Sequence, residues 1–255
     1  MNIFLIIILF IIGIIFGSFY NVVGYRIPKG QSILYPSSHC TNCNHKLGFL
    51  ELIPILSFVF LGGKCKKCKV KISMFYPIFE FITGCAFAIS YIVFGLSLEC
   101  LYSIIFLSML IILIISDYQT MIIPDSVLVF FSLLLMFCKF FISGIESIGI
   151  SLLHALAAFI FMLALKLLGD FLFKKDSMGG GDIKLLAVFG FVLGFPLSIV
   201  SVFLSAFIAL PISLVVLKLK KTHEIPFGPY LAVSAIIIFL TQIDISWLIK
   251  ILTIS

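Results

Sequence analysis

The most constraining feature of this chain is an apolar run that begins at its third residue. Residues 3–25 carry no charged side chain across 23 positions. A helix of that length, at 1.5 Å per residue, crosses a hydrocarbon core of roughly 30 Å. No basic segment precedes the run and no small-residue cleavage site follows it. We therefore expect a retained transmembrane helix and not a removed signal peptide.

The remainder of the chain is similarly apolar and predicts more helices of this kind. Hydrophobic residues make up 62% of the sequence, charged residues make up 11%, and the mean hydropathy is +1.31. The further apolar segments are residues 75–98, 101–116, 127–142, 148–173, 183–195, 197–217 and 227–243. Their continuous runs lack the alternation of a membrane β-barrel. The sequence therefore predicts an all-α polytopic membrane protein with about eight transmembrane helices, or six to eight because some segments are short.

The basic residues assign a side of the membrane to each loop. Residues 26–71 hold eight of the 17 basic residues, and the loops at 174–184 and 218–223 are also rich in lysine. The opposite side receives Glu99, Glu146 and Asp244, with only Lys139 and Lys250 near it. Because cytoplasmic loops carry an excess of Lys and Arg, we place the basic side, and with it the turn at 117–125, in the cytoplasm. The same rule accounts for the net charge of +6 without nucleic acid as a partner.

The first cytoplasmic loop contains four cysteines in two C-x-x-C pairs. "CTNC" provides Cys40 and Cys43, and "CKKC" provides Cys65 and Cys68 after an interval of 21 residues. Two such pairs supply the four soft ligands of a tetrahedral zinc site. The alternative, two disulfides, is disfavoured by the reducing cytoplasm. We expect a structural zinc ion, with the neighbouring His39 and His45 outside its ligand shell.

Two aspartates lie at the ends of apolar segments on the cytoplasmic side. Asp117 occurs in "LIISDYQTMIIPD" and Asp182 in "GGGDIKLL". Ionisable groups at membrane depth are costly and mark functional sites. If the two carboxyl groups meet, one keeps a proton as an acid while the other acts as a base. Such a pair is able to activate a water molecule for attack on a peptide carbonyl.

The surroundings of Asp182 allow two interpretations. The residue precedes an apolar helix and suits the role of an N-cap. In the second interpretation the glycines from Gly179 to Gly181 clear the approach of a substrate backbone to a catalytic carboxylate. Lys184 either supports Asp182 or the substrate, or is an ordinary interface lysine. Asp125, which follows a proline, is predicted to be an N-cap more readily than a catalytic group.

Six motifs in order resemble those of the type IV prepilin peptidases, which belong to the G-x-G-D aspartyl proteases. The first Gly, the second Gly and the Asp of that motif are Gly179, Gly181 and Asp182. The resemblance spans about residues 10–235, and its motifs are "GSFYNVVGYRIP", the four-cysteine loop, "ISMFYPIFE", "SDYQTMIIPD", "GGGDIKLLA" and "PFGPYLA". Departures from the common pattern stand at Thr41, Leu52 and Ser116, and none of them removes a proposed ligand or catalytic group.

The resemblance implies a bifunctional enzyme of the cytoplasmic (inner) membrane. It would cut the basic leader from type IV prepilins or pseudopilins at the cytoplasmic face, with Asp117 and Asp182 as the catalytic pair. It would then methylate the new N-terminal residue with S-adenosylmethionine. Residues 1–100, with the cysteine loop, would be associated with methylation, and residues 101–255 would form the peptidase. The S-adenosylmethionine site is not defined by a motif, and Glu51 and Glu80 are its candidate residues.

Two alternatives remain open at this point. In the first, the enzyme is a prepilin peptidase without methyltransferase activity, and the zinc loop is only a scaffold. In the second, the protein is a proton or ion transporter with Asp117 and Asp182 as relay groups. The second is disfavoured because both aspartates lie at span ends on one side, whereas a relay also needs groups near mid-membrane. The expected partners are the prepilin and the lipid bilayer, and nothing in the sequence indicates an oligomeric state.

Overall fold

The computed structural model describes residues 2–174, 178–220 and 226–243. The described residues form helices and turns, with two isolated β-bridges in the cysteine loop. The predicted all-α class is therefore confirmed. Four residues of the charge argument, Lys175, Lys221, Asp244 and Lys250, lie outside the described residues.

Five of the described helices are long and apolar enough to cross a membrane. They are the first helix with the short turn that follows it (Ile3–Lys29), Phe75–Phe94, Leu98–Thr120, Asp125–Phe173 and Phe195–Val216. Two further helices, α6 (Gly180–Leu193) and α8 (Gly228–Leu240), are shorter. Each of the eight apolar segments predicted from the sequence is mostly helical, and two of them lie in the long α5; the segments 75–98, 183–195 and 227–243 run a few residues past their helices. The number that cross the bilayer stays a prediction.

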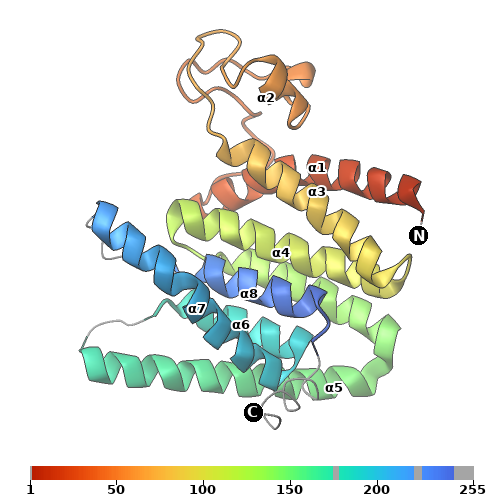
Figure 1. Ribbon diagram of the computed structural model, residues 1–255, viewed down its shortest axis with the longest axis vertical. Helices are drawn as coiled ribbons and strands as arrows, with labels where there is room; N and C mark the ends of the chain where they lie inside the picture. The colour runs from red at the N-terminus through yellow and green to blue at the C-terminus, as the bar shows by residue number, and fades with distance from the viewer. Residues whose placement is uncertain (1, 175–177, 221–225, 244–255) are drawn as a thin grey trace. The chain divides into compact units, whose positions relative to one another are not determined.

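The chain divides into two compact units, residues 1–120 and 121–255. The first unit contains α1 (Ile3–Arg26), α3 (Phe75–Phe94) and α4 (Leu98–Thr120), which pack pairwise (Figure 1). Between α1 and α3 the cysteine loop contains the short helices η1 (Ile27–Lys29), η2 (Phe49–Glu51) and α2 (Leu56–Phe60). Both ends of this loop therefore connect to membrane helices.

Helix α1 approaches α3 closely because glycines remove side chains from the contact. A Cβ atom on Gly13 would lie 2.7 Å from the carbonyl oxygen of Thr83, and one on Gly17 would lie 2.7 Å from the Cα atom of Glu80. Two glycines four residues apart are a common device for tight helix packing in membranes. Buried hydroxyls join α1 to α4 as well, since the Tyr20 hydroxyl donates to Ser108 Oγ at 2.7 Å.

The second unit contains α5 (Asp125–Phe173), α6, α7 (Phe195–Lys220) and α8. Helix α5 changes direction near Gly144, whose φ of 75° departs from the helical range (Figure 1). The two arms, 125–143 and 145–173, are about 28 and 44 Å long at 1.5 Å per residue, so each has the length of a membrane span. A single glycine thus replaces the loop expected around residues 143–147.

Candidate active site and cysteine cluster

The four cysteines of the loop converge on one point. Their sulfur atoms all lie within 4.8 Å of one another. Each C-x-x-C pair sits in a tight turn in which the first cysteine exchanges backbone hydrogen bonds with residues four and five positions later. The turns are completed by Asn44 and Lys69, both with positive φ. The predicted ligand set, Cys40, Cys43, Cys65 and Cys68, is therefore brought together by two turns of the same design.

The sulfur spacing fits a tetrahedral metal ion and not disulfides. The Cys40 and Cys68 sulfurs are 3.7 Å apart, and those of Cys43 and Cys65 are 3.9 Å apart. With Zn–S bonds of about 2.3 Å, a tetrahedron places its sulfurs about 3.8 Å apart. A disulfide would need about 2.05 Å. The cluster can therefore hold a zinc ion, and the disulfide alternative is not the state of these four thiols.

Local hydrogen bonds prepare the cluster for a cation by shifting the thiol pKa values. The backbone N–H of Val70 lowers the pKa of Cys68 to about 6. The backbone N–H of Cys43 lowers the pKa of Cys40 in the same way. At Cys43 the backbone N–H of His45 lowers the pKa, but burial and the neighbouring thiols outweigh this effect and raise the pKa to about 11. Because metal binding needs thiolates, the first turn and the second turn each contribute one readily ionised ligand.

The histidines and glutamates of the loop support its fold. His45 Nε2 lies 3.1 Å from Glu51 Oε2, which also accepts the Gly48 N–H at 2.8 Å. This Gly48 bond, with His45 beside it, lowers the pKa of Glu51. The His39 ring lies 2.9 Å from the carbonyl oxygen of Ser37. Neither histidine joins the sulfur cluster, as the sequence predicted.

Glu80 ties the cysteine loop to α3. The side chain is buried, and its Oε2 accepts the backbone N–H of Ile55 at 2.7 Å. Ile55 has a φ of 59°, a conformation that a β-branched residue rarely adopts. The Glu80 carboxylate thus holds a strained turn in place, while Glu51 Oε1 is buried without a hydrogen-bond partner among the described residues. Their roles at S-adenosylmethionine stay predictions.

Asp117 lies inside a helix and not after one. Helix α4 continues to Thr120, so the carboxyl group belongs to its last turn. Its residue is only 6% exposed and follows the fully buried Ser116. This placement agrees with a carboxyl group at the border of an apolar segment. Asp117 belongs to the first unit and Asp182 to the second, and their pairing stays a prediction.

Asp182 is not the N-cap of α6. The N-cap is Gly179, and Asp182 is the third helical residue, 7% exposed. A Cβ atom at Gly179 would lie 3.7 Å from Asp182 Oδ2, so the carboxylate turns back toward the start of the helix. The interpretation of the three glycines as clearance for a substrate stays a prediction, and Gly181 has a second reason to be glycine. A Cβ there would lie 2.7 Å from the Cβ of Ile123, so this glycine packs against the protein itself.

Lys184 pairs with Asp125 and not with Asp182. Its Nζ lies 2.7 Å from both carboxylate oxygens of Asp125. The predicted N-cap role of Asp125 is also wrong, because Pro124 occupies that position and Asp125 is the first residue of α5. Both side chains are more than half exposed. The ion pair links the first residue of α5 to the second turn of α6, at the end of α6 where Asp182 lies.

A groove at the end of α4 was not expected from the sequence. It has a volume of about 450 Å³ and lies between the start of α3 and the end of α4. Its floor includes the stacked rings of Phe75 and Tyr118, with centroids 5.2 Å apart. Ser73, Tyr76, Ile78 and Gln119 complete the lining. Tyr118 is the neighbour of Asp117, so the groove opens one residue from a candidate catalytic group.

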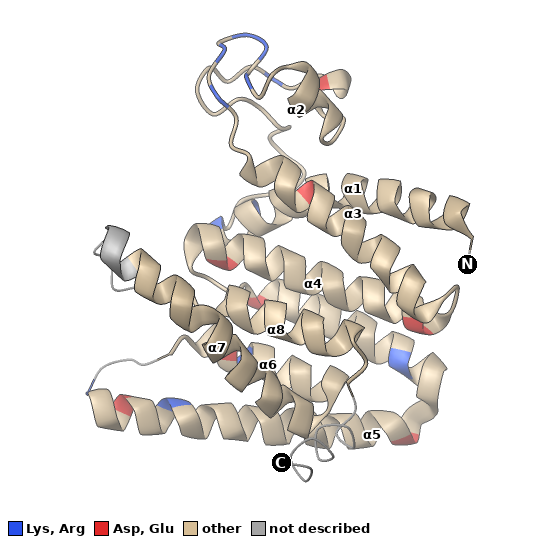
Figure 2. Cartoon of the chain, in the orientation of Figure 1, with Lys and Arg blue, Asp and Glu red and all other residues tan. Residues whose placement is uncertain are grey.

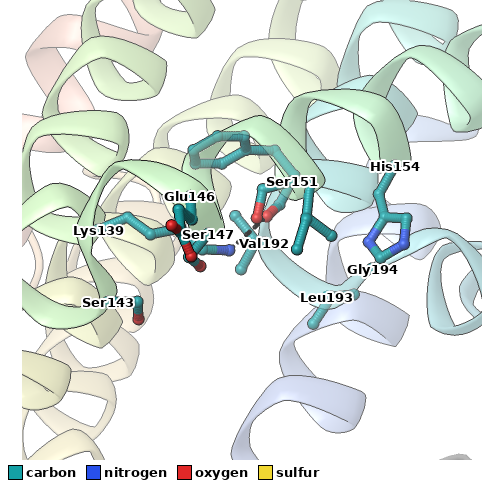
Figure 3. Close-up of a pocket in the computed structure, with 11 residues that line it drawn as sticks. Lys139, Ser143, Glu146, Ser147, Ser151, His154, Val192, Leu193 and Gly194 are labelled. Carbon is teal, nitrogen blue, oxygen red and sulfur yellow. Dashed lines mark hydrogen bonds between the residues drawn. The ribbon is translucent and has the colours of Figure 1, made fainter.

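A second cavity lies at the break in α5, and its lysine has a structural role. It measures about 490 Å³ and includes Lys139, Glu146 and His154 (Figure 3). Lys139 Nζ donates to the carbonyl oxygen of Phe191 at 3.0 Å, so it caps the last turn of α6. Asp182 and Phe191 are about 13 Å apart along the helix. This cavity therefore belongs to the end of α6 opposite Asp182.

These features define the class of the protein. The chain is a multi-pass α-helical membrane protein with a four-cysteine cluster and two buried aspartates. Residues 11–94 match the family model of the bacterial peptidase A24 N-terminal domain. Residues 104–214 match that of the type IV leader peptidase family.

Relatives that cover most of the chain agree with the family models. A prepilin leader peptidase/N-methyltransferase of Bacillus subtilis (strain 168) is 43% identical over 236 residues, which cover 91% of this chain and 93% of that protein. The protein of the same name from Neisseria gonorrhoeae is 31% identical, with 93% and 90% covered. The one from Klebsiella pneumoniae is 32% identical, with 73% and 84% covered. No solved structure matches the chain. The chain therefore belongs to the type IV leader peptidase family and is an enzyme of the peptidase class.

Proposed function

We propose that the protein is an aspartyl endopeptidase of the cytoplasmic membrane that removes the leader peptide of type IV prepilins at the cytoplasmic face. It then methylates the new N-terminal residue with S-adenosylmethionine. The names of the whole-chain relatives support both activities. The lysine-rich loops support a cytoplasmic location of the cleavage site.

The burial of two aspartates carries the peptidase assignment. Among the described residues, Asp117 and Asp182 are the buried aspartates, and Glu80 is the one buried glutamate. Glu80 has a structural function at Ile55. Both aspartates lie within residues 104–214, the segment that matches the leader peptidase family. Burying a carboxyl group in an apolar protein is costly, so a chemical function accounts for its presence.

The helix ends favour different tasks for the two carboxyl groups. Asp182 lies in the first turn of α6, where the unpaired backbone N–H groups stabilise a negative charge. Asp117 lies in the last turn of α4, where the unpaired carbonyl groups disfavour one. We therefore assign the base to Asp182 and the acid to Asp117.

The proposed cleavage follows from these two tasks. Asp182 accepts a proton from water while the water oxygen bonds to the scissile carbonyl carbon. Asp117 donates its proton to the carbonyl oxygen, which forms a tetrahedral diol. The C–N bond then breaks as the leaving nitrogen takes a proton from Asp182 and Asp117 recovers one from the diol. The products are the leader carboxylic acid and the free amine of the mature pilin.

The groove at the end of α4, lined by the sequence neighbour of Asp117, fits the substrate that this assignment needs. A prepilin has a basic leader before an apolar helix, so its cleavage point rests at the membrane border. The aromatic floor of Phe75 and Tyr118 offers an apolar contact there, next to hydroxyl groups of Ser73 and Tyr76. A segment that changes from polar to apolar matches such a lining.

Substitution of each aspartate tests the peptidase assignment. Asp117→Asn and Asp182→Asn remove one acid or base each and should abolish cleavage of a co-expressed prepilin. Glu99→Gln is the matched control, because Glu99 is an exposed carboxylate about 27 Å along the same helix as Asp117. Electrophoresis of the prepilin reports cleavage. Retained cleavage in both aspartate variants would end the assignment.

The cysteine cluster is proposed to hold structural zinc and to shape the methylating part of the enzyme. The family models divide the chain near residue 100, in agreement with a methylation-associated region at 1–100 and a peptidase region at 101–255. Of the two candidate glutamates, Glu51 keeps one carboxylate oxygen for a ligand. Mass determination of the mature pilin tests the second activity, since methylation adds the mass of one methyl group to its N-terminal residue. An unmodified mature pilin would mean that the enzyme is a peptidase without methyltransferase activity.

A further inference from the structure

One stretch of the cysteine loop presents a large apolar surface. Residues 49–61 read "FLELIPILSFVFL" and contain one charged residue. Six of their side chains are exposed, and we call them the apolar patch: Phe49, Leu50, Leu52, Leu56, Val59 and Phe60. Phe49 and Phe60 are 84% and 83% exposed. Exposed apolar surface of this size marks an interaction site.

The structure keeps charge away from the apolar patch. Glu51, its one charged residue, turns inward to His45 and the Gly48 N–H, and its side chain is only 11% exposed. Phe58 also turns inward, because its ring packs over Gly63. The short helices η2 and α2 contact each other and carry the outward side chains. The patch is therefore an ordered surface and not a loose apolar segment.

Lysines follow the apolar patch directly. Five of them, here the lysine cluster, are exposed on the second cysteine turn: Lys64, Lys66, Lys67, Lys69 and Lys71. Figure 2 shows basic segments on the loop beside α2, while α2 itself has none. Among the described residues no carboxylate forms a salt bridge with these lysines. The surface thus combines bulky apolar groups with a net positive charge.

The connections of the loop keep this surface close to the bilayer. The loop leaves the end of α1 and enters α3 at Phe75. Cys68 is seven residues before that point, so the cluster stays within roughly 25 Å of the start of a membrane helix. The anionic headgroups of the leaflet at which α1 ends and α3 begins are therefore within reach.

We infer that the apolar patch inserts into this leaflet while the lysine cluster binds its anionic headgroups. Aromatic and aliphatic side chains combined with lysines are the recognised composition of interfacial membrane anchors. The charge of the cluster favours anionic lipid over an apolar protein segment, which would need no lysines. Docking of this kind fixes the height of the four-cysteine cluster above the bilayer.

Tryptophan fluorescence tests this inference in the full-length, zinc-loaded protein. The chain has one tryptophan, so a Trp247→Phe background with Phe60→Trp gives a single reporter. Thr41→Trp is the matched control, since Thr41 is exposed on the first cysteine turn among polar neighbours. In bilayers of phosphatidylcholine and phosphatidylglycerol, brominated lipids should quench the Phe60→Trp variant and aqueous iodide should not. The Thr41→Trp variant should show the opposite.

The role of the lysine cluster is tested in the protein that carries the Phe60→Trp reporter. Replacing Lys66, Lys67 and Lys69 by glutamine should weaken docking on phosphatidylglycerol-containing bilayers on the order of a hundredfold, measured as the loss of bromine quenching. On bilayers of pure phosphatidylcholine, the variant and the unsubstituted lysine cluster should dock equally. Retained zinc and prepilin cleavage show that each variant is folded.

Three results would overturn the inference. The first is iodide quenching of the Phe60→Trp variant without bromine quenching, which means an undocked loop. The second is protection from both quenchers, which means that protein covers the patch. The third is protection only after a prepilin is added, which makes the patch a substrate surface. None of these outcomes depends on the assignment of the catalytic aspartates.

Discussion

The triple glycine before Asp182 makes a sharp prediction, because two neighbouring glycines have different surroundings. A Cβ at Gly181 would lie 2.7 Å from the Cβ of Ile123, whereas a Cβ at Gly180 has no atom within 4 Å. A Cβ position is fixed by the backbone, so side-chain rotation at Ile123 cannot relieve the contact. Gly181→Ala therefore forces the turn before α5 away from α6.

The magnitude follows from two opposing effects. Alanine in place of a helical glycine gains up to about 1 kcal/mol of helix propensity at either position. Overpacking at Gly181 costs about 1–3 kcal/mol. Gly180→Ala should thus be neutral or slightly stabilising, and Gly181→Ala should be less stable than it by about 1–3 kcal/mol. Peptidase activity should fall with Gly181→Ala, because Asp182 is the next residue.

A double-mutant cycle isolates this contact. Thermal unfolding of the purified protein is measured for Gly181→Ala, for Ile123→Gly and for the double variant. Ile123→Gly removes the clashing Cβ, so in the double variant it should recover about 1–3 kcal/mol of the stability that Gly181→Ala loses. Ile123→Ala keeps that atom and should recover less. Equal stability of the Gly180→Ala and Gly181→Ala variants would refute the packing argument. Lost cleavage at unchanged stability would instead support substrate clearance.

Three further substitutions test other contacts of the structure. Glu80→Ala leaves the part-buried N–H of Ile55 without its acceptor and should lower the free energy of unfolding by about 1–3 kcal/mol, whereas Glu80→Gln should lower it less; chemical denaturation measures both. Cys65→Ser should lose most of its zinc in metal analysis of the purified protein, and Cys85→Ser, outside the cluster, should keep it. Asp125→Asn removes an exposed ion pair with Lys184 and should cost no more than about 1 kcal/mol, less at high salt, in thermal unfolding at two ionic strengths.

Hydropathy predicted the membrane helices well because burial in lipid depends on composition over a whole segment. It was less accurate where a helix continues through polar residues. The segment predicted to end at Ser116 continues as helix to Thr120, since backbone hydrogen bonding does not stop at the first charge. Hydropathy also placed a loop near Glu146, where the structure needs only a positive φ at Gly144.

The cysteine cluster was predictable because its ligands lie in two short sequence motifs with known geometry. Gly13 and Gly17, four residues apart in α1, also form a pattern that is typical of tight helix packing, but the strong apolar bias of the segment masks it. The partners of Lys184 and Gly181 were not predictable in this way. Both lie about 60 positions earlier in the chain, and no local pattern indicates that they meet.

These contacts give a physical reason why two of the family motifs occur together in one chain. "MIIPD" and "GGGDIK" form one structure, because Ile123 fills the space that Gly181 leaves and Asp125 binds Lys184. Both contacts flank Asp182, one on each side in sequence. The position of this carboxylate is therefore set by residues of the preceding motif. Since that motif also contains Asp117, a change in the turn between Asp117 and Asp125 should disturb both candidate catalytic groups together.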